Sequence, residues 1–330
     1  MSSGRDVFIF SAGKLHRKNN TLYFVNEEGK SQPLPVEQTE NIHLLGNVDF
    51  NSSLLHILTQ HQVRLHVYNH YGYYDGTYYP RDSTVSGYNV VQQSSHYLNP
   101  AKRLFLAKAF IQSGVHHMVR NLRKQGEATK PYVDTMMSRV ALLDAATGIP
   151  QAMGVEGQCR QVYYEAFPFL LKNAGFEWSG RNKRPPKDPL NAMISFGNGV
   201  MYTTILSEVY KTALDPAISY LHEPSSKRFS LCLDIAEIFK PLLIDPLVFT
   251  LVNNRRIQPK HFRNEDGMYF LNEEGRKIFL TDFEAKMKET IKHRKLGRQV
   301  SYRYLIRLEA YKLIKHMIGD ETYKPLKAWW

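Results

Sequence analysis

The chain has 330 residues, of which 43% are hydrophobic and 22% are charged, a balance typical of a globular protein long enough for two domains. Its formal net charge of +12 points to a polyanionic partner, with nucleic acid favoured over a membrane surface. The absence of an apolar run of about 18 residues and of a signal-peptide pattern excludes a helical membrane span and favours the cytoplasm, as do two cysteines without a disulfide framework.

Residues 1–80 are predicted to form a β-rich domain. Short runs of β-branched and aromatic residues alternate there with turn sequences. One helix is expected to interrupt them, because Asn51 or Ser52 can cap it and leucines and an isoleucine over 54–58 supply an apolar stripe. The tyrosines of 71–79 either stack on bases or, as their residue type favours, belong to the sheet and an interface. The predicted strands cover 7–10, 21–25, 42–45, 63–67 and 77–79.

Residues 81–100 are polar and serine-rich, and we expect a linker there. From residue 101 the hydrophobic period becomes helical, and helices are expected to dominate to residue 330, apart from a loop over 179–189 and a break near residue 266. One helix is expected to begin at residue 101 and another to cover 133–148. The fold class is therefore predicted to be α+β, with a small N-terminal β-rich domain and a larger all-α C-terminal domain over 101–330. The helix that begins at residue 101 is expected to bury Leu104, Phe105, Ala109, Phe110 and Ile111.

The stretch 191–241 contains the most informative pattern. It predicts a buried helix, an irregular segment that contains His222, and a second helix that carries Asp234 and Glu237 on one face. This pattern suits either a metal or acid–base site, or a hydrogen-bonded histidine and a solvated helix face. Apolar neighbours of the two acids favour the first interpretation, because a carboxylate near a buried face is costly unless it is paired or binds a metal. Glu156 is the candidate for a further ligand.

The C-terminal segment 292–316 is strongly basic. We predict an amphipathic helix there with a positive outer face, which makes it the best single candidate for phosphate contacts. Only Glu309 opposes its basic residues, which are Lys292, Arg294, Lys295, Arg298, Arg303, Arg307, Lys312 and Lys315.

Several segments together resemble a known family, the CRISPR-associated integrase of spacer acquisition, which is numbered "one" among the Cas proteins. The segments around the candidate site are GVEGQCRQVYYEAF, DPLNAMISFGNGVMYTTILSEVYKTALDPAISYLHE and SLCLDIAEIFKPLLID. The resemblance covers essentially the whole chain. The subtype that accompanies type I-B systems is indicated by FSAGKLHRKNNTLYF, YNHYGYYDGTYYPRDSTVSG and YRYLIRLEAYKLIKHMIGDETYKPLKAWW.

This resemblance implies a catalytic site made of Glu156, His222, Asp234 and Glu237. Its metal ligands would be Glu156, His222 and Glu237, with Asp234 as a neighbouring acid. The resemblance also implies a homodimer formed largely through residues 1–80 and a complex with the small CRISPR-associated protein numbered "two". Double-stranded and branched DNA would be bound by basic residues, for which the candidates are Arg160, Lys227, Arg298, Arg303 and Arg307.

The implied reaction inserts captured foreign DNA into a CRISPR array by attack of a 3′-hydroxyl on repeat DNA. Two carboxylates and an imidazole suit Mn²⁺ or Mg²⁺, although this donor set does not exclude zinc. Hydrolysis is expected as well, because water can replace the hydroxyl. Two alternatives remain, a non-catalytic DNA-binding scaffold and a structure-specific DNA repair nuclease. An intact set of acids and histidine argues against the scaffold.

Overall fold

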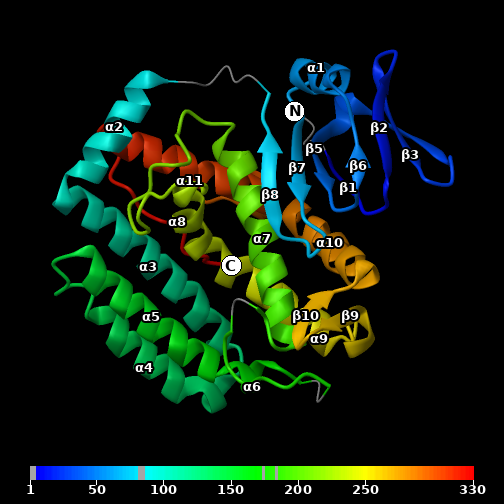
Figure 1. The fold of residues 1–330 in the computed structure, drawn as a ribbon. Coiled ribbons are helices and arrows are strands. Elements are labelled where there is room, and N and C mark those ends of the chain that lie inside the picture. The colour runs from blue at the N-terminus through cyan, green and yellow to red at the C-terminus, as the bar shows by residue number, and fades with distance from the viewer. Residues whose placement is uncertain (1–4, 81–85, 173–174, 183–184) are drawn as a thin grey trace. The chain divides into compact units, whose positions relative to one another are not determined.

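The computed structural model describes residues 5–80, 86–172, 175–182 and 185–330 (Figure 1). The chain packs into two compact units, Met1–Ser83 and Thr84–Trp330. We find no helix in the described ranges that is long and apolar enough to cross a membrane. A β-rich N-terminal part followed by a predominantly helical part confirms the predicted fold class in outline.

The N-terminal unit contains two four-stranded sheets. In the first, of order β1-β5-β7-β8, β5 pairs in parallel with β1 and β7, while β8 is antiparallel to β7. The second sheet has the order β4-β3-β2-β6. The strands of the first sheet are β1 (Arg5–Ile9), β5 (Thr39–Leu44), β7 (Arg64–Tyr68) and β8 (Tyr74–Tyr78), and those of the second are β2 (Gly13–Lys18), β3 (Thr21–Asn26), β4 (Ser31–Leu34) and β6 (Val48–Asp49).

All five predicted strands are confirmed, but β2, β4 and β6 were missed. In β2 the only fully buried side chain is Leu15, so its sequence GKLHRK shows little of the alternation that identifies a strand. Strand β4 contains Pro33, which is tolerated because β4 lies at the edge of its sheet.

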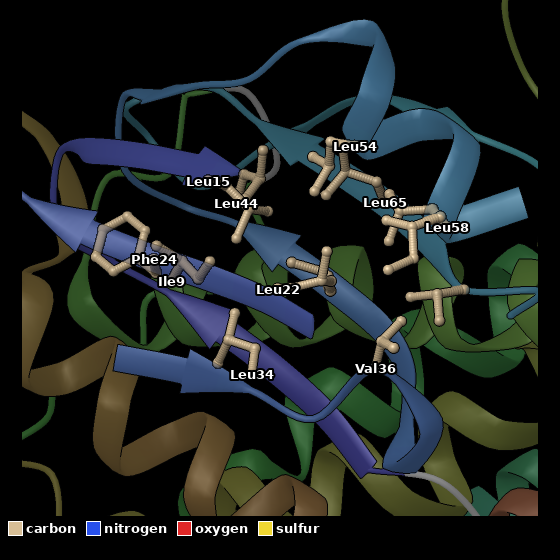
Figure 2. Close-up of a cluster of buried hydrophobic side chains, with 13 residues drawn as sticks. Ile9, Leu15, Leu22, Phe24, Leu34, Val36, Leu44, Leu54, Leu58 and Leu65 are labelled. Atoms are coloured by element: carbon tan, nitrogen blue, oxygen red, sulfur yellow. The ribbon is translucent and has the colours of Figure 1, made fainter. Parts of the chain in front are cut away.

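Helix α1 (Ser52–Gln60) closes the core of this unit. The side-chain oxygen of Asn51 accepts the backbone N–H of Leu54 at 3.3 Å, which confirms the predicted cap. Figure 2 shows Leu54 and Leu58 of α1 gathered with Leu65 of the first sheet and Leu22 of the second. These side chains belong to a larger buried cluster that draws on both sheets and α1, and its burial stabilises the unit.

The C-terminal unit consists mainly of helices. They are α2 (Gly87–Leu98), α3 (Pro100–Arg123), α4 (Lys130–Ala141), α5 (Ile149–Glu165), α6 (Phe167–Leu170), α7 (Pro189–Val209), α8 (Ser230–Phe239), α9 (Asp245–Asn253), α10 (Glu273–Lys288) and α11 (Tyr302–Met317). A π-helical turn, η3 (Lys240–Ile244), joins α8 to α9. Figure 1 shows α3, α4 and α5 packed side by side, and α3 also packs on α8.

Several sequence expectations for this unit need correction. It is not all-α, because β9 (Phe262–Glu265) pairs with β10 (Met268–Leu271), and β11 (Thr290–Lys292) pairs with β12 (Gln299–Ser301). Asp266 and Gly267 both have positive φ and form the tight turn of the first hairpin. Residues 81–85 of the expected linker lie outside the described residues, and most of the remainder forms α2, which Ser86 caps.

Two details of the predicted helices are also wrong. The helix expected over 133–148 ends at Ala141, and Pro150 stands in the first turn of α5 instead of terminating a helix. Proline suits that position because the first turn of a helix leaves its N–H groups unpaired. In α3, Phe105 is 40% exposed rather than inward, whereas Ala109, Phe110 and Ile111 are buried as expected.

Helix α7 packs on α8, α11 and η3. Its side chains are buried on almost every side, as the sequence predicted. A Cβ on Gly197 would lie 2.8 Å from both Ile244 and Phe279, so only glycine permits this close approach. The α7 helix therefore holds η3, and with it the C-terminal end of α8, in a fixed place.

Candidate active site

Two acids predicted for the site, Glu156 on α5 and Glu237 on α8, meet through one basic side chain. Arg160 lies one helical turn after Glu156, and its Nε pairs with Oε1 of Glu156. Its guanidinium also donates to Oε2 of Glu237, while Lys240 Nζ lies 3.3 Å from Oε1 of the same carboxylate. The two carboxylates therefore converge on a single positive charge.

The ion pairs keep Glu237 ionised although the side chain is only 9% exposed. Burial by itself would raise the pKa of this carboxyl, but the charges of Arg160 and Lys240 outweigh burial and lower the pKa to about 2. The same carboxylates raise the pKa of Arg160 against the effect of its own burial. The site is thus a cluster of closely paired and largely buried charges.

His222 lies in the irregular segment between α7 and α8, as predicted, and Asp234 holds it there. Nδ1 of His222 is 2.8 Å from Oδ1 of Asp234. The fully buried carboxylate also accepts the backbone N–H groups of Tyr220 at 2.6 Å, Leu221 at 3.0 Å and His222 at 2.9 Å. Because a carboxylate only accepts, Nδ1 carries the proton of this hydrogen bond, and Nε2 is the ring nitrogen left to meet another partner.

The acids and His222 do not form a finished metal site by themselves. Within the described ranges, no three His, Cys, Asp or Glu side chains are grouped closely enough to hold a metal ion. The donor types nevertheless fit a divalent cation. Both carboxylates already pair with a cationic side chain, and Nε2 of His222 is the ring nitrogen that Asp234 does not bind. In this structure both carboxylates are instead paired with the guanidinium of Arg160.

Helix α3 positions α8 through residues that the sequence did not reveal as functional. A Cβ on Gly114 would lie 2.8 Å from the backbone oxygen of Glu237. Nδ1 of His117 lies 3.0 Å from the carbonyl oxygen of Ile238, and Asn121 Nδ2 donates to the carbonyl oxygen of Pro241 at 2.7 Å. The available signal was the spacing of three and four residues, which places 114, 117 and 121 on one face of a helix.

Asp245, at the start of α9, was also missed. It is 5% exposed, and burial raises its pKa to about 6 against the opposing charge of Arg160. Its carboxyl is hydrogen-bonded to Tyr163 of α5. The sequence could not reveal this buried acid, because its neighbours come from α5, from η3 and from Arg181 before α7.

The basic residues predicted to contact DNA occupy unlike environments. The helix predicted over 292–316 is wrong in its first part, since 290–301 form the β11–β12 hairpin. Arg298 is exposed there, whereas Arg303 is 8% exposed and pairs with Glu284 at 2.8 Å. Arg307 pairs with the fully buried Glu208 at 2.8 Å, and Arg160 is held by the two acids. Lys227 is exposed in a turn with a φ of 64°.

The comparison with known proteins places this chain in a family. The model of the family described as CRISPR associated protein Cas1 matches residues 7–285. The chain belongs to the Cas1 family. A CRISPR-associated endonuclease Cas1 of Clostridium perfringens is 49% identical over 99% of this chain and 100% of its own length. A second Cas1 endonuclease, from Thermodesulfovibrio yellowstonii, is 48% identical over 99% of this chain and 100% of its own length.

A solved structure gives the same result for the fold. A Cas1 protein from Thermotoga maritima superposes with a TM-score of 0.89, at 39% identity, over 97% of this chain and 99% of its own. The family resemblance drawn from the sequence segments is thereby confirmed.

Proposed function

We propose that this Cas1 chain is a divalent-metal-dependent DNA endonuclease and integrase that inserts captured foreign DNA into a CRISPR array. The observation that carries the proposal is the convergence of Glu156 and Glu237 on one cation close to His222. A scaffold that only binds DNA has no use for two carboxylates gathered at a site that would face phosphates. The names of the two endonuclease relatives support the same reaction class.

The side chains divide into ligands and residues that orient them. Glu156, Glu237 and Nε2 of His222 would hold Mg²⁺ or Mn²⁺, and the ion would supply Lewis-acid stabilisation of charge on the scissile phosphate. Asp234 orients His222 by accepting its Nδ1 proton and by fixing the backbone of 220–222. Lys227 and Arg298 are exposed and would bind DNA phosphates electrostatically.

The test compares three site variants with one control on a branched DNA substrate. Glu156→Gln, His222→Ala and Glu237→Gln should each abolish metal-dependent cleavage and strand transfer while DNA binding persists. Glu165→Gln is the matched control, because Glu165 lies on the same helix as Glu156 and is exposed. Turnover retained by all three site variants would end the integrase proposal in favour of a DNA-binding scaffold.

A structure-specific repair nuclease has the same site requirements and differs in its substrate. Strand transfer of a 3′-hydroxyl end into repeat DNA, compared with transfer into unrelated duplex, separates the two functions. Preference for the repeat supports the integrase, while branch cleavage without any strand transfer supports the repair nuclease.

We also propose that residues 1–80 form the dimerisation domain and that 101–330 form the catalytic, DNA-binding domain of a cytoplasmic homodimer. The small CRISPR-associated protein numbered "two" is the proposed further partner, and double-stranded and branched DNA are the proposed ligands. Sedimentation of the full-length chain at micromolar concentration tests the dimer, which a purely monomeric species would contradict.

A further inference from the structure

Arg160 has a place that neither a DNA contact nor a simple surface ion pair explains. Its side chain is 16% exposed, and those of its two partners, Glu156 and Glu237, are 20% and 9% exposed. Three formal charges on α5 and α8 are thus largely withdrawn from water. Such an arrangement is stable only while opposite charges remain paired, because an uncompensated buried charge is expensive.

The shape of the guanidinium explains why an arginine stands here. Its planar fork presents N–H donors in diverging directions, so Nε serves Glu156 while a terminal nitrogen serves Glu237. The ammonium group of Lys240 reaches only Oε1 of Glu237. Arg160 is therefore the group that joins α5 to α8 across the two acids.

Arg160 occupies one oxygen of each of the two carboxylates that are the proposed metal ligands. It binds Oε1 of Glu156 and Oε2 of Glu237, and Lys240 binds the remaining oxygen of Glu237. If a metal ion were bound between these carboxylates while the guanidinium kept its present position, the two positive charges would repel each other at close range. Occupation of the site by one therefore excludes the other.

We propose that Arg160 is a built-in counter-cation, an inference that rests on the proposed function. Arg160 holds the metal-free site together, and a divalent cation must displace it in order to bind. Arg160 then lowers the apparent metal affinity and stabilises the chain when metal is absent. Its role is that of a positioning residue and competitor, with a measurable signature in metal binding that does not depend on turnover.

The experiment is calorimetric titration of the full-length chain with Mn²⁺, combined with thermal unfolding with and without the ion. Arg160→Gln should bind Mn²⁺ about tenfold more tightly or better, since no buried ion pair has to be broken. The same variant should unfold at a lower temperature without metal and gain more from added Mn²⁺ than the wild type does. Arg160→Lys, which keeps the charge but not the fork, should give an intermediate affinity.

Arg139→Gln is the matched control. Arg139 lies on α4, donates to Gln158 of α5 at 3.0 Å, and carries the same charge near the same helix. Its replacement should leave the Mn²⁺ affinity unchanged, which separates direct competition from a general loss of positive charge.

Unchanged or weaker Mn²⁺ binding by Arg160→Gln, with the wild type binding normally, would overturn the inference alone. Arg160 would then organise the carboxylates for the metal instead of competing with it. Failure of wild type and Arg160→Gln alike to bind Mn²⁺ would contradict the metal site itself and the inference with it. Binding by Arg160→Gln but not by the wild type would be its strongest support.

Discussion

His222 and Asp234 are joined by a hydrogen bond, in which the imidazole Nδ1 lies 2.8 Å from a carboxylate oxygen and the carboxylate is fully buried. The same carboxylate accepts three backbone N–H groups of residues 220–222. Asp234 therefore has its accepting positions filled by the segment that carries His222. We therefore propose that Asp234 orients His222, and that Glu237, Glu156 and His222 are the direct metal ligands.

Replacement of Asp234 by Asn should weaken the site without deleting a ligand. The amide has one accepting oxygen where the carboxylate has two, so buried N–H groups lose their partner and the free energy of unfolding should fall by about 3 kcal/mol. Mn²⁺ affinity should fall roughly 10- to 100-fold, and excess Mn²⁺ should partly restore strand transfer. Urea unfolding and a Mn²⁺ titration measure the two effects, and no change in either would mean that Asp234 orients nothing.

Gly114 is expected to be sensitive to the smallest substitution. A Cβ in Gly114→Ala would lie 2.8 Å from the backbone oxygen of Glu237, so α8 must shift. Overpacking of this kind costs about 1–3 kcal/mol of stability, and a shift of about 1 Å at a catalytic group can cost on the order of a hundredfold in rate. Strand-transfer rates and urea unfolding of the variant measure both.

Gly154→Ala is the control for this prediction. Gly154 lies in α5 with no atom within 4 Å of an added Cβ. Alanine should stabilise the helix by up to about 1 kcal/mol and leave the rate unchanged. Equal behaviour of the two variants would show that the approach of α3 to Glu237 does not position the site.

His117 makes stability depend on pH. Burial, with the nearby charges of His116, Arg120 and Lys327, lowers its pKa to about 3, although its bond to the Ile238 carbonyl opposes the shift. Nδ1 donates to that carbonyl and Nε2 accepts the N–H of Ala328, so the folded state holds the ring neutral. Its contribution is therefore fully present above the ordinary histidine pKa of about 6.5 and is lost as the pH falls toward 3.

The size of this effect follows from the shift. At pH 5 His117 is protonated in the unfolded chain but stays neutral in the folded chain. The free energy of unfolding should therefore be about 2 kcal/mol lower at pH 5 than at pH 8. Urea unfolding of the wild type and of His117→Gln at both pH values isolates this residue. If the wild type loses no more unfolding free energy between pH 8 and pH 5 than His117→Gln does, the neutral, buried state of this ring is contradicted.

DNA binding should depend on the β11–β12 hairpin more than on α11. Arg294, Lys295 and Arg298 are exposed in the hairpin. Their replacement by Gln should reduce the dependence of log K on log salt by about 0.9 for each phosphate that the variant no longer neutralises. Arg303→Ala should instead lower the free energy of unfolding by about 3 kcal/mol, because a largely buried ion pair with Glu284 is lost. An unchanged salt dependence in the hairpin variant would exclude this surface.

Local signals were sufficient to predict part of the fold and site. Asn51 caps α1 as its residue type indicates, and His222 lies in an irregular segment because of Pro224 and the neighbouring serines. The placement of Asp234 and Glu237 on one helix was also correct. These features depend on residues that are near one another in the chain.

Features that depend on distant residues could not be predicted. The pairing of Arg160 with Glu237 joins α5 to α8, whereas the sequence predicted Arg160 only as a candidate DNA contact. The hairpin at 290–301 was mistaken for a helix because its charges continue the pattern of α11, while only the pairing of Thr290 with Ser301 and its neighbours defines the strands. Tertiary contacts overrode the local pattern in both places.

Strand transfer by Glu237→Gln across a Mn²⁺ titration tests the metal-dependent reaction most directly. The amide keeps the size of the side chain but removes the charge that Arg160 and Lys240 now neutralise. We predict no transfer of a 3′-hydroxyl DNA end into repeat duplex at any Mn²⁺ concentration, with DNA binding intact and Glu165→Gln fully active. Transfer by Glu237→Gln that recovers to the wild-type rate at high Mn²⁺ would contradict the assignment of Glu237 as a direct metal ligand.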